Sequence, residues 1–165
     1  GTHVAQMLKA VGLKVQGWSR TEKNLDGIQS FSGELGLDQM LANTNFLACL
    51  LPNTQATKGI LNLRVFNKMP QGSYVLNAGR GSQLVELDLL QALDNGQIRG
   101  AALDVFETEP LPTNHPFWMD KRILLTPHHA AEVYLPAVAK TFLDNISRSR
   151  NNEPLIGLVD EDLGY

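Results

Sequence analysis

The feature that most restricts the fold is a short apolar run that passes into an arginine between two glycines. The sequence YVLNAGRG covers residues 74–81, and a leucine-rich helical pattern begins at residue 85. This order indicates a buried strand whose carboxyl end turns into a helix, the end at which open α/β sheets bind ligands. Gly79 and Gly81 carry no side chain, so we expect a ligand to approach the backbone closely beside Arg80.

Helical and strand-like patterns alternate along the rest of the chain. Apolar residues recur at helical spacing in five segments, at residues 2–11, 37–41, 62–69, 86–95 and 137–150. Apolar runs typical of strands lie at residues 13–18, 28–31, 46–51, 101–105 and 123–125. Prolines keep residues 107–118 from forming a helix or a central strand. We therefore predict an α/β fold with a doubly wound parallel sheet covered on both faces.

Composition narrows the classes of function. The chain has 165 residues, about one domain, and a hydrophobic fraction of 43% that is typical of soluble globular proteins. The formal charge of −3 gives no reason to expect nucleic acid or an anionic membrane as a partner. No apolar run approaches the ~20 residues of a transmembrane helix, and no signal peptide is recognisable, so we expect a cytoplasmic protein. The single cysteine, Cys49, is expected to be a buried thiol rather than a nucleophile.

Three polar residues follow the ends of predicted strands: Arg80, Glu109 and His128. A guanidinium binds a carboxylate through two hydrogen bonds, and a histidine exchanges protons near neutral pH. A carboxylate bonded to that histidine fixes its tautomer and favours its charged form. Each residue alone has a simpler explanation, as a helix cap, a solvated charge or a partner of backbone groups. Their shared place on the predicted ligand side favours a site for a 2-oxo or 2-hydroxy acid.

Five motifs resemble, in order and spacing, the signature of the D-isomer-specific 2-hydroxyacid dehydrogenases. They are LNAGRG at residues 76–81, AALDVF at 101–106, EPLP at 109–112, HPFW at 115–118 and TPH at 126–128. The resemblance covers essentially the whole chain, and the bacterial glyoxylate/hydroxypyruvate reductases of the A type are the branch that it resembles most. It implies a Rossmann-type fold and an enzyme that reduces small 2-oxo acids with a nicotinamide cofactor.

The resemblance also implies roles for the three polar residues. Arg80 would bind the substrate carboxylate, and His128 would protonate the ketone oxygen as hydride arrives. Glu109 would pair with His128 and keep it protonated. This agrees with the chemistry, because alkoxide charge must be neutralised where it forms. The neighbouring His129 is expected to be structural, and no metal is expected.

Residues 1–150 would form the dinucleotide-binding domain and residues 151–165 a tail. Gly1 would be the third glycine of the family's Gly-x-Gly-x-x-Gly turn. The first strand of the domain, the earlier glycines and the preceding substrate domain are absent from this sequence, so we expect an N-terminally truncated fold. We also expect the chain alone to be a poor catalyst, because most of the pyrophosphate cradle and one wall of the active site lie outside it.

The end of the predicted strand at residues 13–18 indicates the cofactor. NAD-binding domains place an acidic residue there for the ribose 2′-hydroxyl, whereas this chain has Ser19, Arg20 and Thr21. A hydroxyl and a guanidinium suit a 2′-phosphate, so we predict NADP(H) in preference to NAD(H), which remains possible. By the resemblance, four further residues would contact the cofactor: Leu51 and Pro52 on the adenine side, and Asp104 and the carbonyl of Ala78 at the nicotinamide carboxamide.

Two alternatives to a glyoxylate/hydroxypyruvate reductase stay open at this point. One is another D-2-hydroxyacid dehydrogenase, of the phosphoglycerate or D-lactate type. The other is a non-catalytic, cofactor-sensing binding module with the same fold. The resemblance further implies a homodimer formed through the cofactor domain.

Overall fold

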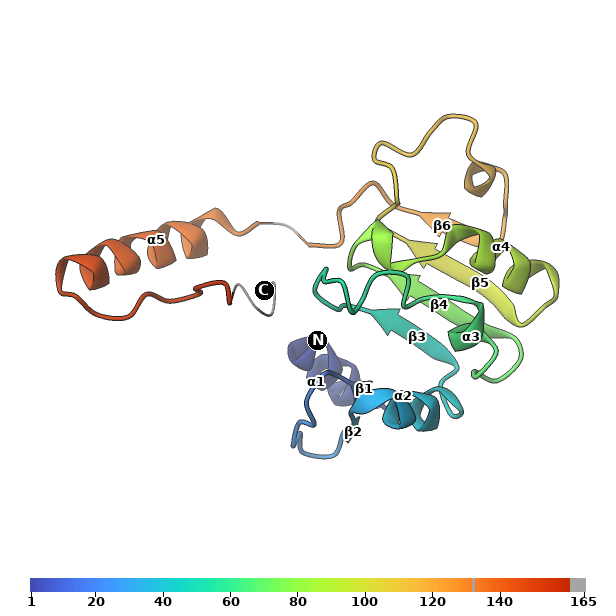
Figure 1. Cartoon of the computed structure of the whole chain (residues 1–165), viewed down its shortest axis with the longest axis horizontal. Coiled ribbons are helices and arrows are strands. Elements are labelled where there is room, and N and C mark those ends of the chain that lie inside the picture. The colour runs from blue at the N-terminus through green and yellow to red at the C-terminus, as the bar shows by residue number, and fades with distance from the viewer. Residues whose placement is uncertain (132, 161–165) are drawn as a thin grey trace.

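The computed structural model describes residues 1–131 and 133–160, which form helices alternating with short strands (Figure 1). The helices are α1 (Thr2–Ala10), α2 (Gly33–Leu41), α3 (Leu63–Phe66), α4 (Glu86–Asp94) and α5 (Leu135–Arg150). The strands are β1 (Gln16–Trp18), β2 (Gln29–Phe31), β3 (Phe46–Cys49), β4 (Ser73–Asn77), β5 (Ile98–Leu103) and β6 (Ile123–Leu125). Two 3-10 turns, η1 (Gly81–Gln83) and η2 (Pro116–Trp118), complete the order.

All strand pairs within the sheets are parallel, which confirms the predicted sheet type. Strands β3, β4, β5 and β6 form one four-stranded sheet in chain order, and β1 pairs with β2 in a separate two-stranded sheet. The predicted single sheet is therefore present as two separate sheets, one of β1 and β2 and the other of β3 to β6. Because β4, β5 and β6 are neighbours and parallel, the loops that follow them meet at one edge of the sheet.

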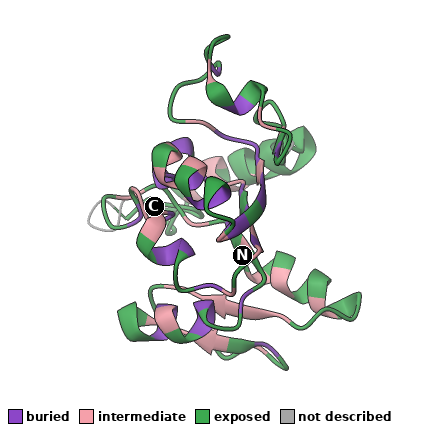
Figure 2. Cartoon of the chain, turned by 90° about the vertical axis from the view of Figure 1, so that its right-hand side faces the viewer, coloured by how far each residue is buried: buried purple, intermediate pink, exposed green. Residues whose placement is uncertain are grey.

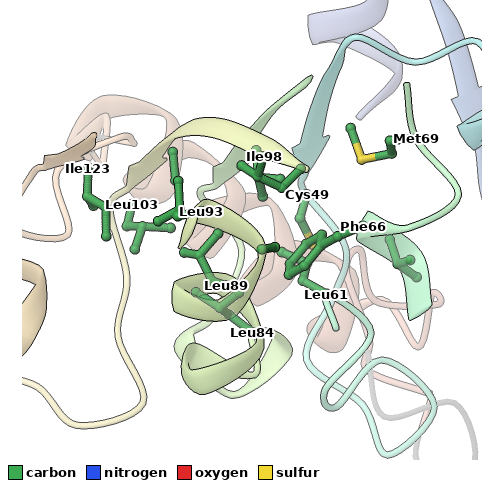
Figure 3. Packing of buried hydrophobic residues seen from close by; sticks show 14 of the residues in the cluster. Cys49, Leu61, Phe66, Met69, Leu84, Leu89, Leu93, Ile98, Leu103 and Ile123 are labelled. Carbon is green, nitrogen blue, oxygen red and sulfur yellow. The ribbon is translucent and has the colours of Figure 1, made fainter. Parts of the chain in front are cut away.

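The hydrophobic core lies between the four-stranded sheet and helices α3 and α4 (Figure 3). Phe66, Leu89 and Ile98 are completely buried there, and each large apolar side chain buried in this way contributes about 1.5–3 kcal/mol to stability. Cys49 belongs to the same cluster and is buried as predicted. Burial raises the pKa of its thiol, which makes it a poor nucleophile at neutral pH.

The opposite face of the four-stranded sheet is open, contrary to our expectation that helices cover both faces. The pairing register places Leu76 and Leu124 on this face together with Ala48. Leu124 is 65% exposed and Phe46, at the edge of the same face, is 68% exposed. Phe46 is covered only in part by Tyr74, whose ring stacks on it at 5.0 Å. Among the described residues, helices α3 and α4 pack on the face of the sheet that holds the core, and not on this exposed face.

Several element boundaries differ from the sequence prediction. Strand β5 covers Ile98–Leu103 rather than residues 101–105. Its pairing with β4 starts at Ile98 opposite Ser73, and the register then shifts past Arg99 so that Gly100 lies opposite Tyr74. Helix α3 is only four residues long, starting after the N-cap Asn62, whose side chain accepts a bond from the Val65 amide. The proline-bearing loop 107–118 contains the short turn η2. Helix α4 ends as predicted, with Gly96 in the left-handed region at φ +77°.

Helix α5 extends away from the sheets (Figure 1), and none of the residues described in it is buried (Figure 2). It begins two residues earlier than the predicted helix, at Leu135. Residues 161–165 of the expected tail lie outside the described residues. Within the described part of the chain, no helix combines the length and apolar character needed to cross a membrane.

Candidate active site

Arg80, Glu109 and His128 line one cleft of about 300 Å³ at the carboxyl edge of the four-stranded sheet. Arg80 follows β4, Glu109 lies in the loop after β5, and His128 follows β6. The other lining residues come from the same loops and from the segment after β3: Asn53, Gly81, Ser82, Phe106 and Glu107. The topology thus brings together the three residues that the sequence singled out.

The turn that carries Arg80 is held by the buried side chain of Asn77. Its amide donates to the Arg80 carbonyl at 3.1 Å, and its Oδ1 accepts from the Gly79 amide at 3.1 Å. Arg80 itself has an extended backbone, with φ −138°, and an exposed side chain. Its Nη1 donates to the Gly79 carbonyl at 2.8 Å. The guanidinium is therefore presented at the surface of a rigid turn.

The two glycines that flank Arg80 serve the packing of the chain itself, a role that the sequence did not indicate, and the approach of a ligand beside them stays a prediction. A Cβ at Gly81 would lie 1.8 Å from the carbonyl oxygen of Phe106, and one at Gly79 would lie 2.1 Å from Oε1 of Gln83. Both distances are too short for any side chain. The close approach of Gly81 to Phe106 brings the Arg80 turn against the loop that holds Glu109.

Glu109 and His128 form a carboxylate–histidine pair. Nδ1 of His128 lies 2.8 Å from Oε2 of Glu109, and Oε1 of Glu109 accepts from the Phe106 amide at 3.0 Å. The hydrogen bond from His128, followed by that from the Phe106 amide, lowers the pKa of the Glu109 carboxyl. Because the pairing occupies Nδ1, Nε2 is the ring nitrogen that can exchange a proton with a bound molecule.

Asp104 holds the turn that carries His128, a role that sequence reasoning missed. Its Oδ1 accepts from the His129 amide at 2.8 Å and its Oδ2 from the Ala130 amide at 2.9 Å, while the Thr126 hydroxyl donates to Oδ1. Burial opposes the charge, but these three donors outweigh it and lower the pKa of Asp104. The His128 backbone has φ +53°, and its amide bonds the Asp104 carbonyl at 2.8 Å. A contact of Asp104 with nicotinamide stays a prediction.

A second carboxylate–histidine pair, also missed, anchors the loop that contains Glu109. Nε2 of His115 lies 3.1 Å from Oε2 of Glu86, the first residue of α4, and both side chains are mostly buried. Nδ1 of His115 accepts from the Phe117 amide, so Nε2 carries the hydrogen. Oε1 of Glu86 accepts in addition from the Glu107 amide at 3.3 Å. His115 lies in the HPFW motif at residues 115–118, but nothing in the sequence linked it to Glu86, 29 positions before it.

The predicted cofactor residues lie outside this cleft lining. Gly1 is the N-cap of α1, and the turn after β1 contains Ser19, Arg20 and Thr21. Ser19 Oγ donates to the Thr21 carbonyl at 2.7 Å. Leu51 and Pro52 follow β3, and Ala78, which follows β4, donates its amide to the Cys49 carbonyl at 3.2 Å. Among the described residues, no three His, Cys, Asp or Glu side chains are grouped to hold a metal ion.

A parallel α/β sheet whose carboxyl edge carries an arginine and a carboxylate–histidine pair has the architecture of a dinucleotide-binding oxidoreductase domain. Residues 1–130 match the family model described as "D-isomer specific 2-hydroxyacid dehydrogenase, NAD binding domain". The chain therefore belongs to the D-isomer-specific 2-hydroxyacid dehydrogenase family, as the five motifs predicted.

Individual relatives agree with this assignment. The glyoxylate/hydroxypyruvate reductase A of Photorhabdus laumondii is 48% identical over 166 residues, covering 100% of this chain and 53% of that protein. A D-isomer-specific 2-hydroxyacid dehydrogenase of Xanthobacter autotrophicus Py2, solved with NADPH and MES, superimposes with a TM-score of 0.97 at 38% identity, covering 100% of this chain and 68% of that one. The NADPH-dependent glyoxylate/hydroxypyruvate reductase of Sinorhizobium meliloti, solved with NADP and sulfate, gives a TM-score of 0.95 at 39% identity, covering 100% and 54%. The chain spans about half the length of the curated relatives it matches.

Proposed function

We propose that the complete protein containing this chain reduces small 2-oxo acids, glyoxylate to glycolate and hydroxypyruvate to glycerate, with NADPH. The observation that carries the proposal is the meeting of Arg80 with the Glu109–His128 pair in one cleft. Relatives that carry the name glyoxylate/hydroxypyruvate reductase A support the choice of substrates.

The three side chains divide the work of the reduction. Arg80 holds the substrate carboxylate by a bidentate ion pair, which aligns the neighbouring ketone. His128 donates the proton on Nε2 to the ketone oxygen, so that alkoxide charge does not accumulate. Glu109 holds His128 through Nδ1 and stabilises its charged form. NADPH, when bound, supplies the hydride.

The residues present fit a dinucleotide. Gly1 is the N-cap of helix α1, and a Cβ there would meet no atom within 4 Å. The first turn of the helix, which lies within the described residues, contains no acidic residue. The positive end of the helix dipole and an open backbone suit a pyrophosphate. The turn after β1 offers Ser19 and Arg20 for the 2′-phosphate of NADP, Leu51 and Pro52 would line the adenine side, and Ala78 with Asp104 would face the nicotinamide.

We propose a preference for NADPH over NADH. Its support is the Ser19-Arg20-Thr21 turn, which places no carboxylate for a 2′-hydroxyl, together with the NADPH and NADP found in related structures. The ratio of kcat/KM for the two cofactors tests this point. A ratio near one would contradict it.

Steady-state assays of the complete protein test the reaction. We expect NADPH oxidation to be faster with glyoxylate and hydroxypyruvate than with pyruvate or phosphohydroxypyruvate. Preference for either of the latter two would instead support a D-lactate or phosphoglycerate dehydrogenase. Binding of NADPH without turnover of any 2-oxo acid would contradict the enzyme and favour a cofactor-sensing module.

The proposal includes a cytoplasmic homodimer, which rests on the family resemblance. Light scattering of the complete protein tests the dimer, which should have twice the mass of one chain. A monomeric mass at assay concentrations would contradict it.

A further inference from the structure

A buried glutamine next to the Arg80 turn uses all the hydrogen-bonding capacity of its side chain. Gln83, at the end of η1, is completely buried. Its Oε1 accepts from the Arg80 amide at 2.8 Å and from the Cys49 thiol at 3.5 Å. Its Nε2 donates to the carbonyls of Leu51 at 3.1 Å and Pro52 at 3.0 Å. A glutamine amide offers two donors and two acceptor positions, and each of them has a partner here.

The partners of Gln83 belong to two separate parts of the proposed site. Arg80 is the proposed carboxylate-binding residue after β4, and residues 51–52, after β3, lie on the proposed cofactor side. Gln83 fits between these loops because Gly79, in contact with its Oε1, has no side chain. Asn77 holds the same turn from the β4 side through the Arg80 carbonyl. The backbone of Arg80 is thus fixed at its amide by one buried side chain and at its carbonyl by another.

We propose that Gln83 is a positioning residue, which sets the place of Arg80 relative to the cofactor-side loop 51–52 and thereby the alignment of the substrate. This inference rests on the proposed function. Its physical reason is that an apolar residue of equal size would leave the Arg80 amide and the Leu51 carbonyl without the hydrogen bonds that Gln83 makes to them, while the Pro52 carbonyl would keep only the Thr57 hydroxyl. The loops would then separate to reach water, and small misplacements of a binding group cost large factors in rate.

Gln97 offers a matched control, because its Nε2 also donates to two backbone carbonyls, those of Phe66 and Met69, both at 2.9 Å. It precedes β5, at the end of the sheet opposite the cleft. The test compares Gln83→Met with Gln97→Met in the complete protein at saturating NADPH, measuring glyoxylate kinetics and the affinity for oxamate, an unreactive 2-oxo acid analogue. Thermal unfolding of both variants shows how far each loses stability.

We expect Gln83→Met to weaken oxamate binding and to lower kcat/KM by about 10- to 100-fold, whereas Gln97→Met should keep both values within about twofold. Equal effects of the two substitutions would overturn the positioning role, since lost stability alone would then explain them. If Gln83→Met does not fold, hydrogen exchange in the unsubstituted protein decides. An Arg80 amide as protected as those of β4 supports the inference, and unprotected exchange overturns it. Absence of turnover in the unsubstituted protein would refute the proposed function instead, and the Arg80 exchange test would still stand.

Discussion

Replacing Glu109 by glutamine tests the proposed proton transfer, because it removes the charge of this side chain and keeps its shape. The substitution keeps the shape of the side chain, and its one amide oxygen can accept from Nδ1 of His128, which lies 2.8 Å from Oε2 of Glu109. The amide nitrogen then faces the Phe106 amide, which loses the acceptor that Oε1 of Glu109 provides at 3.0 Å. The substitution also removes the negative charge that stabilises the acid form of His128. The loss of charge should therefore appear in the proton-transfer step, and thermal unfolding of the variant measures separately the stability lost at the Phe106 amide.

The size of the effect follows from charge and exposure. Two unit charges about 4 Å apart interact by about 1 kcal/mol in water and about 4 kcal/mol at an effective dielectric constant of 20. The side chains of His128 and Glu109 are 49% and 38% exposed, which places the pair toward the aqueous value. We therefore expect Glu109→Gln to cost about 1–2 kcal/mol, or about a 5- to 30-fold loss of kcat/KM at neutral pH.

The assay is NADPH oxidation with glyoxylate across a range of pH. The pKa of Glu109 is lowered in the folded protein, so its charge is present at neutral pH and is lost only as the pH falls through that lowered value. The difference in kcat/KM between Glu109→Gln and the unsubstituted protein should accordingly become smaller as the pH falls. Equal kcat/KM at neutral pH would refute the role of Glu109.

Two further substitutions test the surroundings of the site. Asp104→Asn should lower the unfolding free energy by about 1–3 kcal/mol and reduce kcat through the His128 turn, while Asp94→Asn, at a mostly exposed side chain, should change neither. Because the pKa of Asp104 is lowered in the folded protein, the stability that its charge contributes is present at neutral pH and is lost as the pH falls through that lowered value. The unfolding free energy of Asp104→Asn, measured with urea, should therefore depend less on pH than that of the unsubstituted protein. An identical pH dependence would count against this role of Asp104. Arg20→Ala should raise KM for NADPH but not for NADH, and an unchanged cofactor ratio would exclude Arg20 from 2′-phosphate binding.

The sequence was sufficient to predict the parallel α/β fold and the grouping of the three site residues. Continuous apolar runs are typical of strands in parallel sheets, and β4, β5 and β6 are neighbours in chain order. Residues just after such strands necessarily meet at one edge. This is why Arg80, Glu109 and His128 could be placed together without any knowledge of their contacts.

The supporting contacts could not be predicted, because they depend on close approaches between distant segments. Gly81 is explained by the backbone of Phe106, 25 positions away along the chain, and the burial of Gln83 by carbonyls more than 30 positions before it. Asp104 follows a strand like many turn-capping aspartates, so its bonds to the His128 turn left no pattern in the sequence. The exposed face of the sheet could not be predicted either, because its strands carry apolar residues such as Phe46 and Leu124, as the strands of a covered face would.

The affinity and turnover of Arg80→Lys, measured in the complete protein, test the central claim most directly. Lysine keeps the positive charge but loses the planar fork that holds a carboxylate through two bonds. We predict a higher KM for glyoxylate and a lower kcat, with a nearly unchanged dissociation constant for NADPH. Unchanged glyoxylate kinetics, or a loss confined to NADPH binding, would contradict the assignment of this cleft as the site of 2-oxo acid reduction.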